Sequence, residues 1–279
     1  MSATQVLMCP PKYFEVNYVI NPWMQRGAVR LALAAQQWER LRAGITAHAE
    51  VVLLEPRPGL PDMVFTANAG VVIDDRVMAS HFQPHERRAE EAHFKDWFRD
   101  HGYALLELPD YIGFEGAGDC LYDAGRTVLW TGLGLRSEPE VLVYLNRAFG
   151  FDIVALRLTD PHYYHLDTCF CPLSGGHVLY FPDAFHPTSR AEIERRVAPE
   201  KRIAVSAADA AQFACNAVNL GHEVFMHRAS EPLRAALERA GYRVHEYELS
   251  EFLKAGGSAK CLTLRLDASP AQSRHARAA

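Results

Sequence analysis

Short strand-like segments outnumber helical segments by about two to one along this chain of 279 residues, and this ratio constrains the fold most. Strict alternation of strand and helix would indicate a doubly wound parallel sheet, whereas a surplus of strands predicts an α/β fold of repeated small modules with mixed sheets. The predicted strands are β-branched or aromatic in character, at 51–54, 70–78, 104–108, 127–130, 153–156, 169–173, 178–181, 202–205, 223–226, 243–246 and 261–266. The predicted helices are 27–44, 86–101, 137–149, 189–196 and 230–240.

No linker or low-complexity segment divides the sequence, so we expect a single domain over residues 1–267. Hydrophobic residues make up 49% of the chain and charged residues 23%, which are ordinary values for a globular protein with a large core. Residues 268–279 contain no large apolar side chain. We therefore expect them to form a disordered tail.

Charge and hydropathy indicate which partners to expect. The net charge of −5 argues against nucleic acid. The first residues lack the features of a secretory signal, and the apolar runs are too short to span a bilayer. Six cysteines are too few for a disulfide scaffold in a chain of this length. We expect a cytoplasmic, soluble protein that binds neither nucleic acid nor membrane; a homo-oligomer is left open.

Four polar clusters lie at the ends of predicted strands, where active sites of α/β folds are usually found: 61–70, 114–119, 165–168 and 256–261. Cys261 follows a Gly-Gly-Ser loop and is expected to open the last strand, where it would be better exposed than a cysteine in mid-strand. A thiolate there would be a strong nucleophile. The alternative is a buried strand cysteine with no chemical role.

Three further residues in these clusters carry acid–base groups. His165 and Asp167 would point to one face of an extended chain, and His165 could act as a general acid or base. Glu115 lies between Phe114 and a Gly-Ala-Gly turn, where it could orient a histidine or pair with a cationic substrate. Each has a purely structural alternative, namely a buried histidine with satisfied hydrogen bonds and a loop carboxylate that faces water.

Phosphate and metal sites are not favoured by the sequence. The glycines at 113–118 and 132–134 match neither glycine fingerprint, and no Gly-Lys-Ser/Thr is present. The spacing of His162, His165, Cys169 and Cys171 fits no standard zinc pattern. The sequence therefore predicts no metal site.

Taken together and in this order, the clusters resemble the guanidine-modifying, or pentein, superfamily. That group includes arginine deiminases, dimethylarginine dimethylaminohydrolases, amidinotransferases and arginine dihydrolases. The resemblance runs from Met8 to about Leu266, and the segments 8–14 and 20–24 resemble the opening of arginine dihydrolase domains. It implies a five-bladed α/β-propeller of ββαβ-type modules with pseudo-fivefold symmetry, in which Cys261, His165 and Glu115 meet at the centre.

The resemblance also implies roles for site residues. Cys261 would be the nucleophile, His165 the general acid/base, and Glu115 the carboxylate that holds the histidine or the guanidinium. Three more positions match substrate-binding residues: Asp62 for the α-amino group, and Arg87 (or its neighbour Arg88) and Arg136 for the α-carboxylate. Because Asn68 is a neutral amide, Glu115 and Asp119 are the carboxylates left to neutralise the guanidinium. Arginine suits a carboxylate because the two groups pair through two parallel hydrogen bonds.

One difference between this chain and other members of the superfamily indicates the substrate. Deiminases and dimethylarginine hydrolases usually carry an acid where this chain has Asn68, whereas arginine dihydrolases resemble this sequence in having Thr-Ala-Asn. The resemblance thus implies an arginine dihydrolase that needs no metal or organic cofactor. A dimethylarginine dimethylaminohydrolase, acting on methylated arginine, is the alternative within the fold, and a non-catalytic propeller that binds a partner is the alternative outside it.

Overall fold

The computed structural model describes residues 4–268, and within them the chain forms five sheets of three strands each. Four sheets are built from consecutive segments. The first module consists of β3 (Gly70–Ile73), β4 (Arg76–Ala79), α2 (Glu90–Asp100) and β5 (Ala104–Leu106), and the second of β6 (Cys120–Asp123), β7 (Val128–Leu133), α3 (Val141–Phe149) and β8 (Asp152–Arg157). The third consists of β9 (Phe170–Pro172), β10 (Val178–Tyr180), α4 (Pro187–Arg196) and β11 (Arg202–Ala204), and the fourth of β12 (Val218–Leu220), β13 (Glu223–Met226), α6 (Glu231–Arg239) and β14 (Arg243–Glu246).

The fifth module joins the two ends of the described chain. It consists of β15 (Leu264–Arg265), β1 (Gln5–Met8), α1 (Leu31–Thr46) and β2 (Glu50–Leu53). In every module the first strand is antiparallel to the second, and a helix connects the second to a parallel third strand. Each module is therefore a ββαβ unit, as the resemblance implied.

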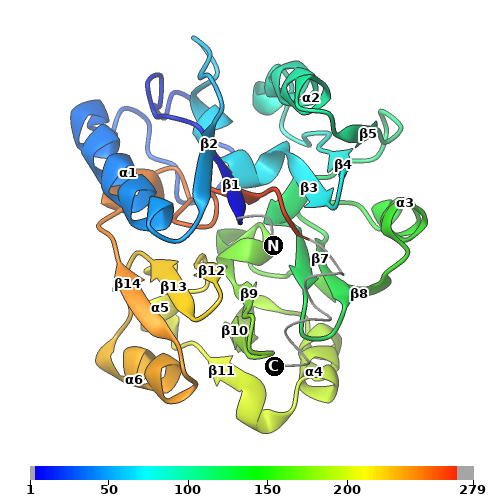
Figure 1. Ribbon diagram of the computed structural model, residues 1–279, viewed down its shortest axis with the longest axis vertical. Helices are drawn as coiled ribbons and strands as arrows, with labels where there is room; N and C mark the ends of the chain where they lie inside the picture. Colours follow the sequence, from blue (N-terminus) through cyan, green and yellow to red (C-terminus); the bar gives the residue numbers. More distant parts are fainter. Residues whose placement is uncertain (1–3, 269–279) are drawn as a thin grey trace.

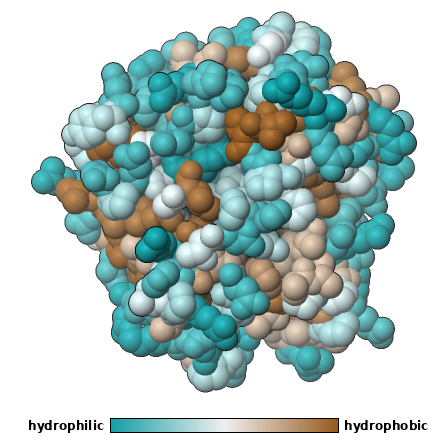
Figure 2. Space-filling model, turned by 180° about the vertical axis from the view of Figure 1, so that it is seen from behind, coloured by the Kyte–Doolittle hydropathy of each residue, from teal (hydrophilic) through white to brown (hydrophobic). Residues whose placement is uncertain are grey.

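The modules are arranged in a ring (Figure 1), with α1, α2, α3, α4 and α6 on the outside and the first strands near the centre. A cavity of about 360 Å³ lies along this axis and is lined by residues of all five first strands, among them Val71, Leu121, Phe170, Val218 and Leu264. The predicted α/β-propeller is thus confirmed. The face seen in Figure 2 is largely hydrophilic, with smaller hydrophobic areas between the polar side chains.

Each helix buries one stripe of apolar side chains against its sheet. In α1 the buried residues Ala34, Trp38, Leu41 and Ile45 recur at intervals of four, three and four, which is the spacing of one helix face. The end of α3 is set by Gly150, whose φ of 71° is the left-handed conformation that glycine adopts at low cost. Two further helices are single turns, α5 (Ala207–Ala210) and α7 (Ser250–Leu253).

Several predicted elements differ from the observed ones. The single strand expected at 70–78 is a hairpin, because Asp74 adopts a φ of 53° and reverses the chain between β3 and β4. The strands β1, β6 and β12 were not predicted. Of the predicted tail, residue 268 accepts a hydrogen bond from the Asp74 amide, and residues 269–279 lie outside the described residues. Among the helices of the described part, none is long and apolar enough to cross a membrane.

Candidate active site

A tight turn precedes the first strand of every module, and neighbouring turns are linked by hydrogen bonds into a closed ring. The turns lie at Thr66–Ala69, Gly116–Gly118, Leu166–Thr168, 211–215 and 259–262. The linking bonds are Asn68 Nδ2 to Glu115 O, Leu166 N to Asp119 Oδ1, Asn216 Nδ2 to Asp167 O, Lys260 N to Asn216 O, and Ala67 N to Cys261 O. This ring brings residues that are far apart in the sequence to one place at the propeller axis.

Cys261 lies in the last of these turns and not in the strand that follows. Its side chain is 2% exposed, so the expectation that it would be better exposed than a cysteine in mid-strand was wrong. The reason is that the turns of the other modules pack around it. Its Sγ lies 3.1 Å from Asn216 Nδ2 and 3.5 Å from Asp167 Oδ2. Burial, reinforced by the negative charge of Asp167, raises the pKa of this thiol well above its usual value, while Asn216 acts in the opposite direction.

Asn216 is hydrogen-bonded through both atoms of its side-chain amide. Its Oδ1 accepts from the amides of Ser258 and Cys261, each at 3.1 Å. Its Nδ2 donates to the sulfur of Cys261 and to the carbonyl of Asp167, also at 3.1 Å. The fourth module therefore fixes both the backbone and the sulfur of Cys261.

His165 and Glu115, which the sequence analysis singled out, are in direct contact. His165 Nε2 lies 2.7 Å from Glu115 Oε2, and Arg136 Nη1 donates to both oxygens of the same carboxylate at 2.9 and 3.1 Å. Glu115 is fully buried, which by itself would raise its pKa, but Arg136 and then His165 lower that pKa to about 2. The hydrogen bond to this carboxylate engages Nε2 of His165, so Nδ1 is the ring nitrogen left for proton exchange.

The Nδ1 atom of His165 is buried and makes no hydrogen bond to any residue that the structure describes. A ring nitrogen in that condition is ready to exchange a proton with a bound molecule. The expectation that His165 and Asp167 share one face of an extended chain was wrong, because residues Leu166–Thr168 form a helical turn. Instead, His165 contacts Glu115 and Asp167 contacts Cys261.

Asp62, Asn68 and Arg87 form a second group of buried polar residues. Arg87 donates to Asn68 Oδ1 at 2.8 Å and pairs with Glu90 at 2.7 Å. Asp62 accepts from the hydroxyl of Tyr18 at 2.8 Å. Burial raises the pKa of Asp62, against the opposing effect of Arg87. Its Oδ1 has no partner among the described residues, so one carboxylate oxygen is free to accept from a ligand.

A small cavity lies between these two groups. Five of the eight predicted site residues line it: Asp62, Asn68, Arg87, Arg136 and Cys261. The other lining residues are Ile20, Asn21, Met24, Phe65, Tyr164 and Ala255. Arg88, the alternative to Arg87, does not line the cavity but donates to the Phe82 carbonyl.

Asp119 is close to the site but is not a lining residue. Its two oxygens accept from the Leu166 amide at 3.0 Å and from the Ser137 hydroxyl at 2.7 Å. Burial raises its pKa to about 6. These bonds fix the backbone next to His165, and they engage both oxygens that were expected to contact a guanidinium.

Asp167 and Asn216 belong to the site, but the sequence analysis did not select them as site residues. Asp167 is fully buried beside the sulfur, and burial raises its pKa to about 6. Its position two residues after His165 was a signal that could have identified it. Asn216 has no distinguishing motif around it, and only its place in the ring of turns reveals it.

Side chains able to share a metal ion come together at one place in the described residues, formed by His48, Glu223 and His245. None of them lines the cavity at Cys261. The four residues weighed for zinc in the sequence do not form such a group within the part of the chain that the structure describes.

Comparison with known proteins relates this chain to enzymes of arginine metabolism. The family described as "N,N dimethylarginine dimethylhydrolase, eukaryotic" matches residues 11–267. The bifunctional arginine dihydrolase/ornithine cyclodeaminase AgrE of Nostoc sp. is 50% identical over 267 residues, which are 95% of this chain and 38% of AgrE. The N(G),N(G)-dimethylarginine dimethylaminohydrolase of Mycobacterium tuberculosis is 37% identical over 261 residues, covering 93% of this chain and 84% of that protein.

Among solved structures, the N-terminal domain of ArgZ bound to its substrate superposes with a TM-score of 0.95 at 48% identity. The match covers 96% of this chain and 99% of that domain, which is described as an arginine dihydrolase from cyanobacteria. The chain thus spans less than two fifths of bifunctional AgrE but nearly all of this separate domain. It belongs to the N,N dimethylarginine dimethylhydrolase family, within the guanidine-modifying pentein superfamily.

Proposed function

We propose that this chain is an arginine dihydrolase, which converts L-arginine to ornithine, ammonia and carbon dioxide with Cys261 as the nucleophile. The observation that carries the proposal is a buried thiol whose sulfur contacts both a hydrogen-bond donor, Asn216, and an acid, Asp167. A cationic substrate suits this position, because its charge is neutralised by Asp167 and favours the thiolate. The names of AgrE and ArgZ support arginine as that substrate.

Substrate binding is proposed to use the polar groups that line the cavity. The free oxygen of Asp62 accepts from the α-amino group, and Arg136 and Arg87 attract the α-carboxylate. The guanidinium then lies over Cys261, next to Asp167. Asp119 stabilises this arrangement indirectly, because it accepts from the Leu166 amide and so fixes the backbone beside His165.

The first hydrolysis follows from these positions. His165 Nδ1 takes the proton of the Cys261 thiol as the sulfur forms a bond to the guanidinium carbon, which gives a tetrahedral adduct. A C–N bond breaks as His165 Nδ1 passes a proton to the departing nitrogen, which leaves as ammonia. Water then attacks the remaining thiouronium, His165 takes its proton, and the C–S bond breaks to give citrulline. Glu115 stabilises the histidinium at each step, since its carboxylate is 2.7 Å from the ring.

A second round on the bound citrulline completes the reaction. The thiolate attacks the ureido carbon, the second ammonia leaves, and water hydrolyses the thiocarbamate to an N-carboxy-ornithine that loses carbon dioxide. Two waters are consumed, and two molecules of ammonia and one of carbon dioxide are released for each arginine. The steps need no redox change, and each proton moves through His165.

The second candidate is a dimethylarginine dimethylaminohydrolase, favoured by the matching family and by the Mycobacterium tuberculosis relative. Incubation with L-arginine and asymmetric dimethylarginine together, followed by mass spectrometry of the products, separates the two. We expect ornithine and ammonia from arginine, untouched dimethylarginine, and no products with Cys261→Ala. Citrulline and dimethylamine would establish the second candidate, and consumption of neither compound would contradict both.

Assembly and location are part of the same proposal. We propose that the enzyme acts in the cytoplasm, where arginine is available, and that it associates as a homo-oligomer. Cell fractionation tests the first statement, and light scattering coupled to size-exclusion chromatography tests the second. A protein that is monomeric at all concentrations would contradict the proposed homo-oligomer and leave the proposed chemistry at Cys261 unaffected.

A further inference from the structure

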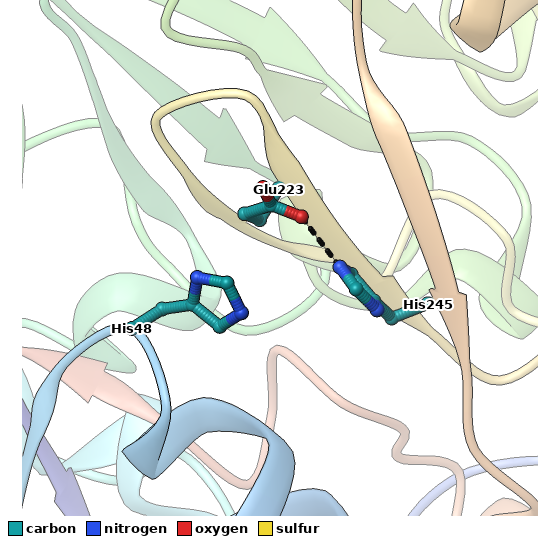
Figure 3. Close-up of side chains that lie close together, drawn as sticks. All are labelled: His48, Glu223 and His245. Carbon is teal, nitrogen blue, oxygen red and sulfur yellow. Dashed lines mark hydrogen bonds and ion pairs between the residues drawn. The ribbon is translucent and has the colours of Figure 1, made fainter.

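Three side chains with metal-binding atoms lie close together between the fourth and fifth modules (Figure 3). His48 follows the C-terminal end of α1, Glu223 begins β13, and His245 lies in β14. One ligand atom from each lies within 4.8 Å of the ligand atoms of the other two. In Figure 3 the two imidazole rings and the carboxylate face a common space.

Neighbouring residues hold two of the three groups in orientation. Glu223 Oε2 is 2.5 Å from His245 Nε2, while Arg243 pairs with the other carboxylate oxygen at 3.1 Å. The ring of His245 stacks on Phe225 at 4.9 Å, and the ring of His48 meets the same Phe225 edge-on at 5.5 Å. Phe225 is fully buried and therefore provides a rigid base for both imidazoles.

We propose that His48, Glu223 and His245 form a binding site for a divalent transition-metal ion, with Zn²⁺ as the best match. Two imidazole nitrogens and one carboxylate oxygen are the donor set that Zn²⁺ accepts with a fourth position left for water. Hard ions such as Mg²⁺ and Ca²⁺ prefer all-oxygen sites. The ion takes the place of the hydrogen bond between Glu223 and His245, and His48 supplies the third ligand; Arg243 remains on the outer oxygen and orients the carboxylate.

The site joins two modules of the ring. Glu223 and His245 belong to the fourth module, whereas His48 belongs to the fifth, which closes the propeller by pairing β1 with β15. A bound ion cross-links these modules. Because it binds the folded chain and not the unfolded one, it raises the thermal midpoint of unfolding. This inference does not rest on the proposed function.

The test is isothermal titration of the metal-free protein with ZnCl₂, together with thermal unfolding with and without the ion. The wild type is expected to bind one Zn²⁺ and to unfold at higher temperature in its presence. His48→Ala, His245→Ala and Glu223→Gln are each expected to weaken binding about tenfold or more, because each removes one of three ligands. His48 is exposed, so its replacement leaves the fold intact.

Two controls make the outcome specific. His162 pairs with Asp160 at 2.9 Å on the exposed surface, so His162→Ala removes a comparable pair and is expected to leave Zn²⁺ affinity unchanged. Titration with Co²⁺ separates this site from Cys261, because thiolate ligands produce a charge-transfer absorption that imidazole and carboxylate ligands do not. Binding that survives all three ligand substitutions, or that shows the thiolate band in the wild type, would overturn the proposal, as would a wild type that binds no Zn²⁺.

Discussion

At the scale of single residues, the contact between Asn216 and the sulfur of Cys261 leads to a prediction about thiolate reactivity. Asn216→Asp keeps an oxygen for the amides of Ser258 and Cys261 but replaces the nitrogen that donates to Sγ. Loss of that donor raises the pKa of the thiol further. The pH at which 2-chloroacetamidine alkylates Cys261 at half its maximal rate is expected to rise by about one unit.

The matched control for this experiment is Asn219→Asp, which adds the same charge in the same module without touching the sulfur. Asn219 bonds instead to the Ser174 amide and to backbone carbonyls. Its alkylation profile is expected to coincide with that of the wild type. An unchanged profile in Asn216→Asp would show that Asn216 supports the turn alone.

Asn68 is the residue expected to control how far the reaction proceeds. Asn68→Asp places a carboxylate beside Arg87 and near the guanidinium site. An added negative charge favours cationic arginine over neutral citrulline, so citrulline is released before the second round. We expect the ratio of citrulline to ornithine to rise severalfold in a product assay. Asn68→Ala, which removes the amide without adding charge, is expected to slow turnover and leave that ratio unchanged; equal ratios in both variants would contradict the prediction.

Residue chemistry in the sequence selected polar groups that the structure places near one another, but it did not predict their burial. His165 contacts Glu115 directly, and Cys261 lines the same cavity as Arg136, the partner of Glu115. The exposure of Cys261 was misjudged because its surroundings come from other modules, which local sequence does not reveal. Asn216 was missed for the same reason, since its partners lie more than forty residues away along the chain.

At the scale of elements, the repeated turns at the axis determine where strands begin. Gly116 starts one of them with a φ of 60°, and a Cβ at this position would lie 2.7 Å from the Gly70 amide nitrogen in the neighbouring module. Gly150 has a similar φ of 71°, but a Cβ there would meet nothing within 4 Å. A comparison of alanine variants at the two glycines therefore distinguishes the cost of backbone strain, which both carry, from the cost of crowding, which only the variant at Gly116 carries.

Gly116→Ala is expected to lower the free energy of unfolding by about 2–4 kcal/mol, and Gly150→Ala by about 1 kcal/mol. Both variants carry the cost of a left-handed alanine, and Gly116→Ala also forces two modules apart. Urea unfolding monitored by circular dichroism measures both values. Equal losses in the two variants would show that the turns do not pack as tightly as the structure indicates.

Element boundaries were predictable where hydrophobic patterns were strong. The strands at 223–226 and 243–246 were predicted with the observed bounds. Strands β1, β6 and β12 were missed because they are short and carry polar residues, such as Gln5, Asp123 and Asn219. The turn at Asp74 was missed because aspartate carries a side chain and gives no glycine signal for a positive φ.

At the scale of the whole molecule, the ring is closed by strands from opposite ends of the described chain. Leu264 of β15 pairs with Leu7 of β1, and both side chains are buried. We propose that residues 4–268 unfold as one domain, since every module contacts two others in the ring. The fivefold arrangement itself followed from the resemblance, because no repeat period was visible in residue identities.

Leu264→Ala tests this cooperativity. Removal of a buried leucine is expected to lower the free energy of unfolding by about 2–5 kcal/mol. Circular dichroism and tryptophan fluorescence should report one shared transition, because Trp38, Trp97 and Trp130 lie in three different modules. Leu53→Ala in the same sheet, at a side chain that is 50% exposed, should have a much smaller effect. Two separate transitions would contradict a single domain.

The covalent intermediate on Cys261 is the central claim, and mass spectrometry of acid-quenched enzyme tests it most directly. Protein mixed with L-arginine and quenched during turnover should carry a substrate adduct that peptide mapping places on Cys261, and Cys261→Ala should carry none and release no ammonia. Arginine consumption without any adduct on Cys261, together with activity in Cys261→Ala, would contradict the account.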